Sequence, residues 1–407
     1  MNLIDKESPF QPGQPVDPNK FKGRIENIKE VTRYFKQVTN GNPQHLFLTG
    51  KRGMGKSSFA RYMVEIAKIN CNMISIHLYL DARTDVEDLV TNIISKIVSE
   101  TEEGWKDKIT SLFADRIKSI DFGGLKLEFN PTKEEITHLT RNFSDVLINI
   151  LDKAGYGEEN GKKGLFIVID DINGLTENPD FANWYKSFAD TLSTEYSGKA
   201  PIFMVLSGLP EKKELLFNHN ESFSRIFHYT NLETLEKSEI KDFYNSMFEK
   251  ENMIVSEKEA MEVMVDYCSG LPVMMHEIGE AVFWADIDNK IDFQDALQGI
   301  LKAGNQIGDK YLKPVVDSNI RSYKYKSIFK KIGNHTFFSN NEGFTRKDLE
   351  EVLNIEEMKV FDDFLRKAKK LGIIELVGAK KIGTYKFANN LYPVYFMIQD
   401  LASLEAE

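Results

Sequence analysis

Short apolar runs alternate with stretches of helical periodicity over the first 230 residues of the chain. Five runs read as buried strands because they are apolar or alternating and are bounded by turn-forming residues: 45–49, 73–81, 165–170, 201–206 and 226–230. Between them, apolar residues recur at three- and four-residue spacing over 57–69, 86–99 and 181–192. Strands that alternate with helices predict an α/β fold with a five-stranded parallel sheet.

Residues 101–131 break this alternation. Apolar positions there predict a helix, and the glycines within 120–129 predict a small hairpin, so we interpret the segment as an insertion. A long helix is then expected from Asn130-Pro131 to Ala154.

Only helical periodicity remains from 236 to 312, which predicts an all-α lid. Beyond it, helices are expected over 323–332, from 344 and over 356–371, and strands over 373–377 and 384–387. Three helices followed by a hairpin are the order of a winged helix. We therefore expect a flexible tail at 1–20, a core at 21–233, a lid at 234–312 and a winged-helix domain at 313–407.

Composition narrows the class of protein. The 407 residues carry a formal net charge of −10, which argues against a wholly basic nucleic-acid-binding surface. The two cysteines, Cys71 and Cys268, have no metal-ligand spacing, and no apolar run is long enough to span a membrane. These features predict a cytoplasmic protein with no membrane partner.

The strongest chemical signal is the stretch Gly50-Lys51-Arg52-Gly53-Met54-Gly55-Lys56-Ser57, followed by Ser58. Its spacing, Gly-x-x-x-x-Gly-Lys-Ser between a strand and a helix, is that of a phosphate-binding loop. Glycines let backbone N–H groups face phosphate oxygens, Lys56 reaches the β- and γ-phosphates, and Ser57 can ligate Mg²⁺. The sequence predicts binding of ATP with Mg²⁺.

Two acids follow the apolar run 165–169. In a phosphate-loop protein the first, Asp170, is expected to complete the Mg²⁺ shell, and the second, Asp171, to act as general base on the attacking water. His77 lies among apolar strand residues and is interpreted as structural.

Two further residues are candidates for sensing the γ-phosphate. Ser207 ends the strand 201–206, where a polar side chain can face the nucleotide, although simple turn chemistry explains it equally well. Arg225 precedes the fifth strand and is a candidate arginine finger in its own or a neighbouring subunit; a surface salt bridge is the alternative.

The predicted winged helix is only slightly basic. Residues 319–407 hold 15 Lys and Arg against 12 Asp and Glu. The candidate contacts to duplex DNA lie on the third helix and in the hairpin turn: Lys367, Lys370, Lys380 and Lys381. A solvated helix face explains the same charges.

With these motifs in order, the chain resembles prokaryotic AAA+/STAND-type ATPases, a group that includes the archaeal origin-recognition ATPases. Phe21-Lys22-Gly23-Arg24 is similar to the Phe-x-Gly-Arg box, and Gly270-Leu271-Pro272 to the Gly-x-Pro signature of STAND lids. The resemblance implies that Phe21, Gly23 and Arg24 lie near the base and ribose and that Pro272 approaches the nucleotide. The residues after Pro272 include no lid arginine, and Asp171 replaces the more usual Glu, which implies slow hydrolysis.

The leading interpretation is a slowly hydrolysing ATPase that acts as a nucleotide-dependent switch and binds DNA through its winged helix. One alternative is a DNA-loading ATPase that assembles as a homo-oligomer, with Arg225 acting in trans. Another is a signalling or defence scaffold whose winged helix contacts proteins. A small-molecule kinase is disfavoured, because the paired acids and the C-terminal modules would have no role in it.

Overall fold

The computed structural model describes residues 7–80, 84–113, 119–120, 127–128, 132–339, 343–377 and 383–404. The chain forms two compact units. The core unit is Pro15–Glu233, and the C-terminal unit runs from Thr234 onward and includes the described residues up to Gln14.

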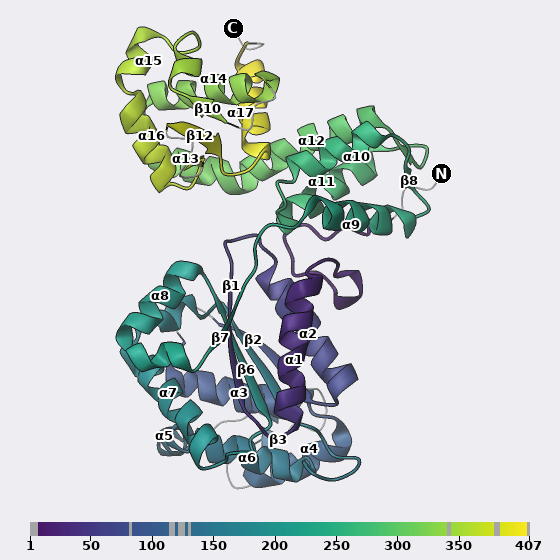
Figure 1. The fold of residues 1–407 in the computed structure, drawn as a ribbon, viewed down its shortest axis with the longest axis vertical. Coiled ribbons are helices and arrows are strands. Elements are labelled where there is room, and N and C mark those ends of the chain that lie inside the picture. The colour runs from purple at the N-terminus through teal and green to yellow at the C-terminus, as the bar shows by residue number, and fades with distance from the viewer. Residues whose placement is uncertain are drawn as a thin grey trace. The chain divides into compact units, whose positions relative to one another are not determined.

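A five-stranded parallel sheet forms the centre of the core unit (Figure 1). Its strands are β1 (Gln44–Thr49), β2 (Ile74–Tyr79), β5 (Leu165–Asp170), β6 (Ile202–Gly208) and β7 (His228–Asn231). They lie in the order β2-β5-β6-β1-β7, and every pairing is parallel. Every residue of β1, β5 and β6 is buried, as continuous apolar runs require in a sheet covered on both faces. The predicted α/β class is confirmed, including β6 between the two strands that carry the loop and the paired acids.

Helices cover both faces of this sheet. They are α1 (Ile25–Thr39), α2 (Lys56–Cys71), α3 (Val86–Glu100), α4 (Glu103–Thr110), α5 (Lys133–Arg141), α6 (Phe143–Lys153), α7 (Pro179–Thr194) and α8 (Pro210–His219). Phe166 and Phe203 face Phe35 of α1, whereas the next residue of each strand, Ile167 and Met204, belongs to the core formed with α3, α6 and α7. Period-2 alternation thus assigns successive strand residues to opposite layers.

The insertion and the helix after it differ from expectation. Strands β3 (Ser119–Ile120) and β4 (Leu127–Glu128) pair antiparallel, and the expected turn between them lies outside the described residues. The single helix expected from 130 to 154 is two helices, α5 and α6, separated at Asn142, whose φ of −106° departs from helical geometry. The Asn142 side chain donates to the carbonyl of His138, an example of the local bonding by which asparagine ends helices.

Residues 7–20 do not behave as the flexible tail that the sequence suggested. Phe10 is buried and its ring packs edge-on against Phe243 and Phe248, while Gly279 leaves the room that the ring occupies. Val16 is also buried, in the core unit. Apolar residues in a proline-rich segment are enough to anchor it when an apolar surface receives them.

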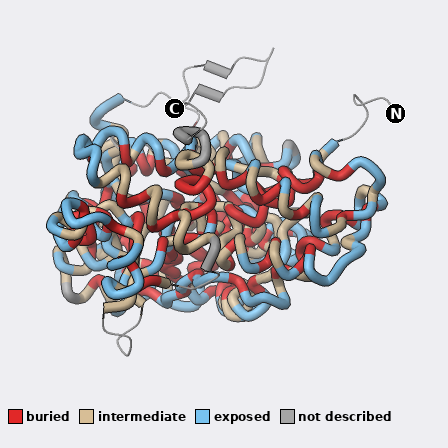
Figure 2. Tube along the Cα trace, turned by 90° about the horizontal axis from the view of Figure 1, so that it is seen from above, coloured by how far each residue is buried: buried red, intermediate tan, exposed pale blue. Residues whose placement is uncertain are grey.

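The C-terminal unit begins with the helices of the predicted lid: α9 (Lys237–Glu249), α10 (Lys258–Tyr267), α11 (Pro272–Ala285) and α12 (Phe293–Ile307). Two short strands, β8 (Ile254–Val255) and β9 (Lys290–Ile291), pair between them. Figure 2 shows red stretches alternating with pale blue and tan ones along the coils of the trace, as expected of amphipathic helices.

The winged-helix segment contains α14 (Tyr323–Ser339), α15 (Ile355–Lys359) and α16 (Phe361–Lys370) with strands β10 (Phe344–Thr345), β11 (Ile374–Leu376) and β12 (Thr384–Phe387). The strands form one sheet in the order β10-β12-β11. Two predicted helices differ: 344–349 is a strand followed by a 3₁₀ turn, and 356–371 is broken at Val360 into α15 and α16.

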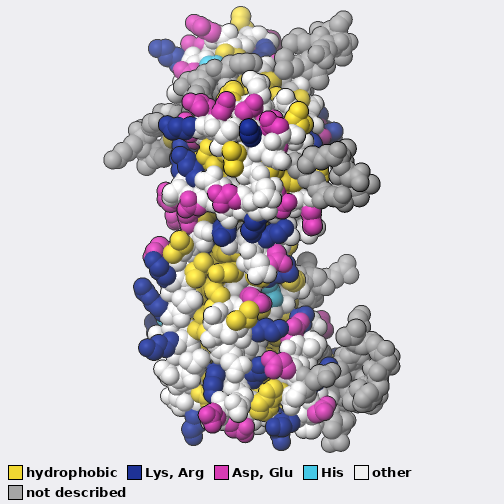
Figure 3. Space-filling model, turned by 90° about the vertical axis from the view of Figure 1, so that its right-hand side faces the viewer, with side chains coloured by type: hydrophobic (Ala, Val, Ile, Leu, Met, Phe, Trp, Pro, Cys, Tyr) yellow, Lys and Arg dark blue, Asp and Glu magenta, His cyan; other side chains and the backbone are white. Residues whose placement is uncertain are grey.

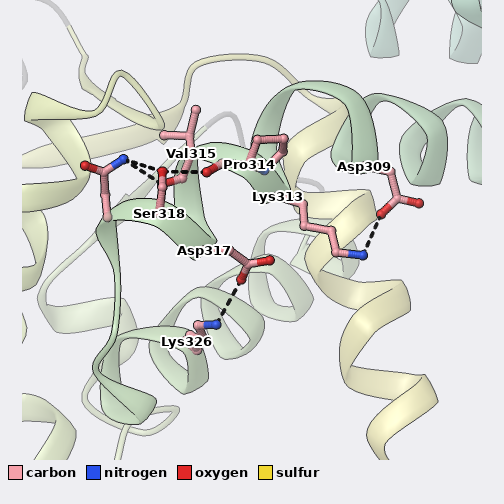
Figure 4. A network of polar contacts seen from close by, with 8 residues as sticks. Asp309, Lys313, Pro314, Val315, Asp317, Ser318 and Lys326 are labelled. Carbon is pink, nitrogen blue, oxygen red and sulfur yellow. Dashed lines mark hydrogen bonds and ion pairs between the residues drawn. The ribbon is translucent and has the colours of Figure 1, made fainter.

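A last helix, α17 (Leu391–Leu404), was not predicted and ties the lid to the winged helix within the C-terminal unit. Leu391 and Val394 belong to the lid core, whereas Tyr395 and Phe396 belong to the winged-helix core. Between the two, α12 continues through a π-helical turn, Gly308–Leu312, into α13 (Lys313–Asn319). Figure 4 shows this connection, with Asp309 paired to Lys313 and Asp317 paired to Lys326 of α14. Among the described residues, no helix is long and apolar enough to cross a membrane.

Candidate nucleotide site

The phosphate loop connects the end of β1 to the start of α2. Gly53 and Gly55 have φ of 81° and 79°, values in the left-handed region that glycine adopts without penalty. Gly50 lies close to the end of β7. A Cβ added at this position would be only 3.0 Å from the carbonyl oxygen of Leu232, so a larger residue would be crowded there. Lys51 and Arg52 are exposed, and Met54 is buried.

Lys56, at the first position of α2, turns back over the loop. Its Nζ donates to the carbonyls of Gly50 at 2.7 Å and Lys51 at 3.2 Å. Burial lowers the pKa of Lys56, and the carboxylates of Asp170 and Asp171 oppose that shift. The ammonium therefore lies against the loop, where both acids favour its charged form.

Asp170 ends β5 and is almost completely buried, so its carboxylate requires polar partners. The backbone N–H of Asp171 donates to Oδ1 at 3.0 Å, and His77 Nε2 lies 3.2 Å from Oδ2. Burial pushes the pKa of Asp170 upward, but the side chains of His77, Ser57 and Ser207 outweigh it and hold the pKa below its ordinary value. Asp170 is thus kept as an anion inside the protein.

Ser207 lies on β6, between the loop strand and the acid strand. Its register partner on β1 is Leu48, and its hydroxyl is buried. The hydroxyl faces the Asp170 carboxylate and helps to keep the pKa of that group low. The structure therefore brings Ser207 to the site beside Asp170.

Asp171 is exposed and adopts a left-handed conformation with φ of 58°. Asn173 donates to its Oδ1, which orients the carboxylate. Left-handed backbone at a residue other than glycine is uncommon and concentrates at functional sites.

The donor set fits the magnesium ion that ATP carries. Ser57 and Asp170 supply a hydroxyl and a carboxylate close together, the hard oxygen ligands that Mg²⁺ prefers. The described residues contain no cluster of three or more His, Cys, Asp and Glu side chains that could hold a metal alone. Mg²⁺ is ordinarily held by one or two side chains together with phosphates and water, so these two residues would be sufficient.

The Phe-x-Gly-Arg residues face the protein. Phe21 stacks on Tyr62 of α2, with ring centroids 4.7 Å apart, and Gly23 has φ of 78°. Arg24 is buried and donates to the Met54 carbonyl at 3.0 Å and to the Glu233 carbonyl. Arg24 thus ties the phosphate loop to the last residue of the core unit. The hydroxyl of Ser58 accepts the N–H of Val16 at 3.1 Å.

Arg225 lies away from the loop. It precedes β7 and is exposed beside a pocket of about 470 Å³ whose lining includes Gln44 and His228 at the amino ends of β1 and β7. The phosphate loop follows the carboxyl end of β1, so the six-residue strand, roughly 20 Å, separates the two. Within one core unit Arg225 therefore lies at the amino ends of the strands and Lys56 at their carboxyl ends.

The remaining predicted site residues belong to the C-terminal unit. Pro272 is the first residue of α11, behind Gly270 with φ of 71°. Lys367 is half-buried and Lys370 exposed, both in the last turn of α16, and Lys380 and Lys381 lie outside the described residues. The roles of Pro272 and of these lysines stay predictions.

Sequence reasoning interpreted His77 only as a structural residue. The structure places it on β2 against Asp170, with its side chain 9% exposed and its ring stacked on Tyr79. A polar residue near the carboxyl end of a strand is the one signal that could have suggested this contact.

Residues 20–187 match a family described as an AAA ATPase domain. Comparison with proteins of curated function finds no significant match. Among solved structures, the ORC2 protein of Aeropyrum pernix in its ADPNP–ADP complexes is similar, with a TM-score of 0.56 and 10% identity over 98% of this chain and 99% of that one. Its ADP form gives a TM-score of 0.50 and 11% identity over 97% of each chain.

These findings agree with the geometry of the loop and its acids. Residues 20–187 are thus similar to an AAA ATPase domain, in a chain whose fold resembles that of the ORC2 protein of Aeropyrum pernix.

Proposed function

We propose that the protein binds ATP with Mg²⁺ at residues 50–57 and acts as a nucleotide-dependent switch that hydrolyses ATP slowly. The observation that carries this proposal is the convergence of Lys56, Ser57 and Asp170 at the carboxyl edge of the sheet. The loop N–H groups and Lys56 bind the β- and γ-phosphates. Ser57 and Asp170 hold the Mg²⁺, whose role is to draw charge from the phosphates.

Asp171 is the proposed general base. Its carboxylate is exposed and oriented by Asn173, next to the metal ligand Asp170. It accepts a proton from the water that attacks the γ-phosphate, and the Lys56 ammonium stabilises the charge that develops on the phosphate oxygens.

The switch is supported by the bonds between the loop and the end of the core unit. Leu232 N–H donates to the carbonyl of Thr49 at 2.8 Å, and Arg24 joins the carbonyls of Met54 and Glu233. A change in the loop on binding or hydrolysis acts directly on the residues after which the C-terminal unit begins.

Two variants test the site. Lys56→Ala should abolish most ATP binding in calorimetry, because it removes the side-chain charge facing the phosphates. Lys68→Ala, an exposed change on the same helix, should bind as the parent does.

Asp171→Asn should bind ATP normally, but its rate of hydrolysis should fall by a factor of about 10² or more, because asparagine tolerates the left-handed backbone but is no base. Normal binding by Lys56→Ala, or normal turnover by Asp171→Asn, contradicts the assignment.

A second candidate concerns the winged helix, which we propose as either a DNA-binding or a protein-binding module. Lys367 and Lys370 on α16 support DNA binding, but the first turn of that helix carries Asp362 and Asp363, and helix-turn-helix modules place this end against the bases. Both acids are exposed and pair with arginines. On the face shown in Figure 3, basic and acidic side chains are interspersed. These charges favour the scaffold alternative, in which the module contacts protein.

Duplex binding at low salt with saturating ATP decides between the two. DNA binding predicts that replacing Lys367, Lys370, Lys380 and Lys381 with Ala flattens the plot of log affinity against log salt by up to about one unit per lysine. No binding by the parent, or equal binding by the replaced protein, assigns the module to protein contacts.

A further inference from the structure

The contact between His77 and Asp170 joins two neighbouring strands at the edge of the sheet that carries the nucleotide site. On β2, Tyr79 is the register partner of Asp170, and His77 pairs with Val168. The imidazole Nε2 lies 3.2 Å from Asp170 Oδ2, and both side chains are more than nine-tenths buried. Lys56, Ser57 and Ser207 approach the same carboxylate from the loop and from β6.

The surroundings of the ring fix its role in this bond. An ionised carboxylate accepts hydrogen bonds and cannot donate, so the imidazole donates from Nε2. The other ring nitrogen, Nδ1, is buried and has no partner among the described residues. The bond therefore requires a ring that carries a hydrogen on Nε2. Tyr79, whose ring centroid lies 4.3 Å from that of His77, limits rotation of the ring.

We propose that His77 is a positioning residue of the nucleotide site: its bond to Oδ2 holds the Asp170 carboxylate in the orientation that binds Mg²⁺ beside ATP. This inference rests on the proposed ATP–Mg²⁺ site. With Oδ2 bonded to His77 and Oδ1 to the Asp171 N–H, the carboxylate has one position, and Mg²⁺ binding costs no reorientation. Groups that orient a metal ligand in this way contribute about 10- to 100-fold to metal affinity.

A purely structural histidine would affect stability and leave the magnesium dependence unchanged, so two substitutions separate the roles. In His77→Gln the side-chain amide nitrogen reaches about as far as Nε2 and can still donate to Asp170. In His77→Asn the side chain is polar but one carbon shorter and cannot reach. Both replace a buried imidazole with an amide, so their effects on the fold should be similar.

The experiment measures the fluorescence of methylanthraniloyl-ATP bound to the full chain while MgCl₂ is titrated. His77→Asn should raise the Mg²⁺ concentration at half-maximal response by about 10- to 100-fold, while binding of the same probe in EDTA should stay at the parent value. His77→Gln should restore the midpoint close to that of the parent. His45→Gln is the matched control, because it removes another buried strand histidine, one bonded to Tyr185 at the opposite edge of the sheet, and should leave the midpoint unchanged.

Each outcome has one meaning. If the parent binds the probe with a magnesium dependence that both His77 variants retain, the positioning role is overturned and the ATP site stands. If both variants shift the midpoint equally, the Nε2 bond is not the cause and the proposal is also overturned. If the parent does not bind the probe at all, the proposed function fails, and this inference fails with it.

Discussion

His45 and His77 occupy buried strands of the same sheet, yet their surroundings give them different properties. His77 lies beside an anion, whereas His45 Nδ1 lies 2.9 Å from the hydroxyl of Tyr185 and its Nε2 is buried without a partner among the described residues. Burial, with a smaller contribution from His228, lowers the pKa of His45 to about 3. The folded protein therefore keeps His45 neutral, while the unfolded chain titrates it near its ordinary value of about 6.5.

This difference predicts a loss of stability in mild acid. Between pH 6.5 and 3 the unfolded chain binds a proton at His45 that the folded protein does not bind, so the free energy of unfolding falls as the pH is lowered. The contribution of His45 is at most about 1.4 kcal/mol per pH unit. Urea unfolding at pH 6.5 and pH 5 should show a shallower decline for His45→Gln than for the parent.

His138→Gln is the control for that comparison. His138 is exposed on α5, so its replacement should leave the decline with pH as it is in the parent. Parallel declines in the parent and in His45→Gln would contradict the assignment of this pH dependence to His45.

At the scale of elements, the close contact of α12 and its π-helical extension with α17 makes the lid and the winged helix one unit. Glycines permit the contact: a Cβ on Gly304 would lie 2.6 Å from Val394, and one on Gly308 would lie 1.9 Å from the ring of Tyr395. Lys310, in the π-helical turn, donates to both carboxylate oxygens of the buried Glu277 on α11. A π-helical turn at such a junction commonly marks a functional position.

Gly308→Ala should therefore destabilise the C-terminal unit. The added methyl group overlaps Tyr395, and overpacking of this kind costs about 1–3 kcal/mol, more than the roughly 0.5–1 kcal/mol that alanine gains over glycine within a helix. Thermal unfolding followed by circular dichroism should show the loss. Lys302→Ala, an exposed change on α12, serves as the control, and equal melting of the two variants would show that the contact tolerates a methyl group.

At the scale of the whole molecule, Arg225 raises the question of assembly. Because it lies at the amino edge of the sheet and the phosphate loop at the carboxyl edge, its side chain cannot serve the nucleotide of its own core unit. Among the described residues no ion pair or hydrogen bond of Arg225 is found, so the alternative of a surface salt bridge gains no support from them. If Arg225 is an arginine finger, it must therefore contact the nucleotide bound by a second copy of the chain.

If a second copy uses Arg225, specific ATPase activity should rise with protein concentration in the parent. Arg225→Ala should remove that rise and leave ATP binding unchanged, because the residue is remote from the loop of its own chain. Lys186→Ala, at the same pocket, is the matched control and should retain the rise. Specific activity that is independent of concentration in the parent would indicate a switch that works as a monomer.

The sequence by itself determined the class of the fold and predicted a phosphate-binding loop. The spacing of residues 50–57 predicts a phosphate loop, and the apolar runs of β1, β5 and β6 predict a buried parallel sheet. Both features can be predicted from the sequence because each depends only on residues that are close together in the chain. Helices were predicted less well where a local break decides the outcome, as at Asn142 and Val360, or where the apolar residues serve two cores, as in α17.

Tertiary structure decided which distant residues meet. His77 reaches Asp170 because β2 lies next to β5, Ser207 reaches it because β6 lies on the other side, and Arg24 bonds to the loop and to Glu233 rather than facing outward. None of these pairings is encoded by local spacing, since the order of strands in a sheet depends on how all the connections pack together. The sequence therefore predicts the loop and the two acids of the site. The residues that contact and orient them, His77, Ser207 and Arg24, are identified only by the folded structure.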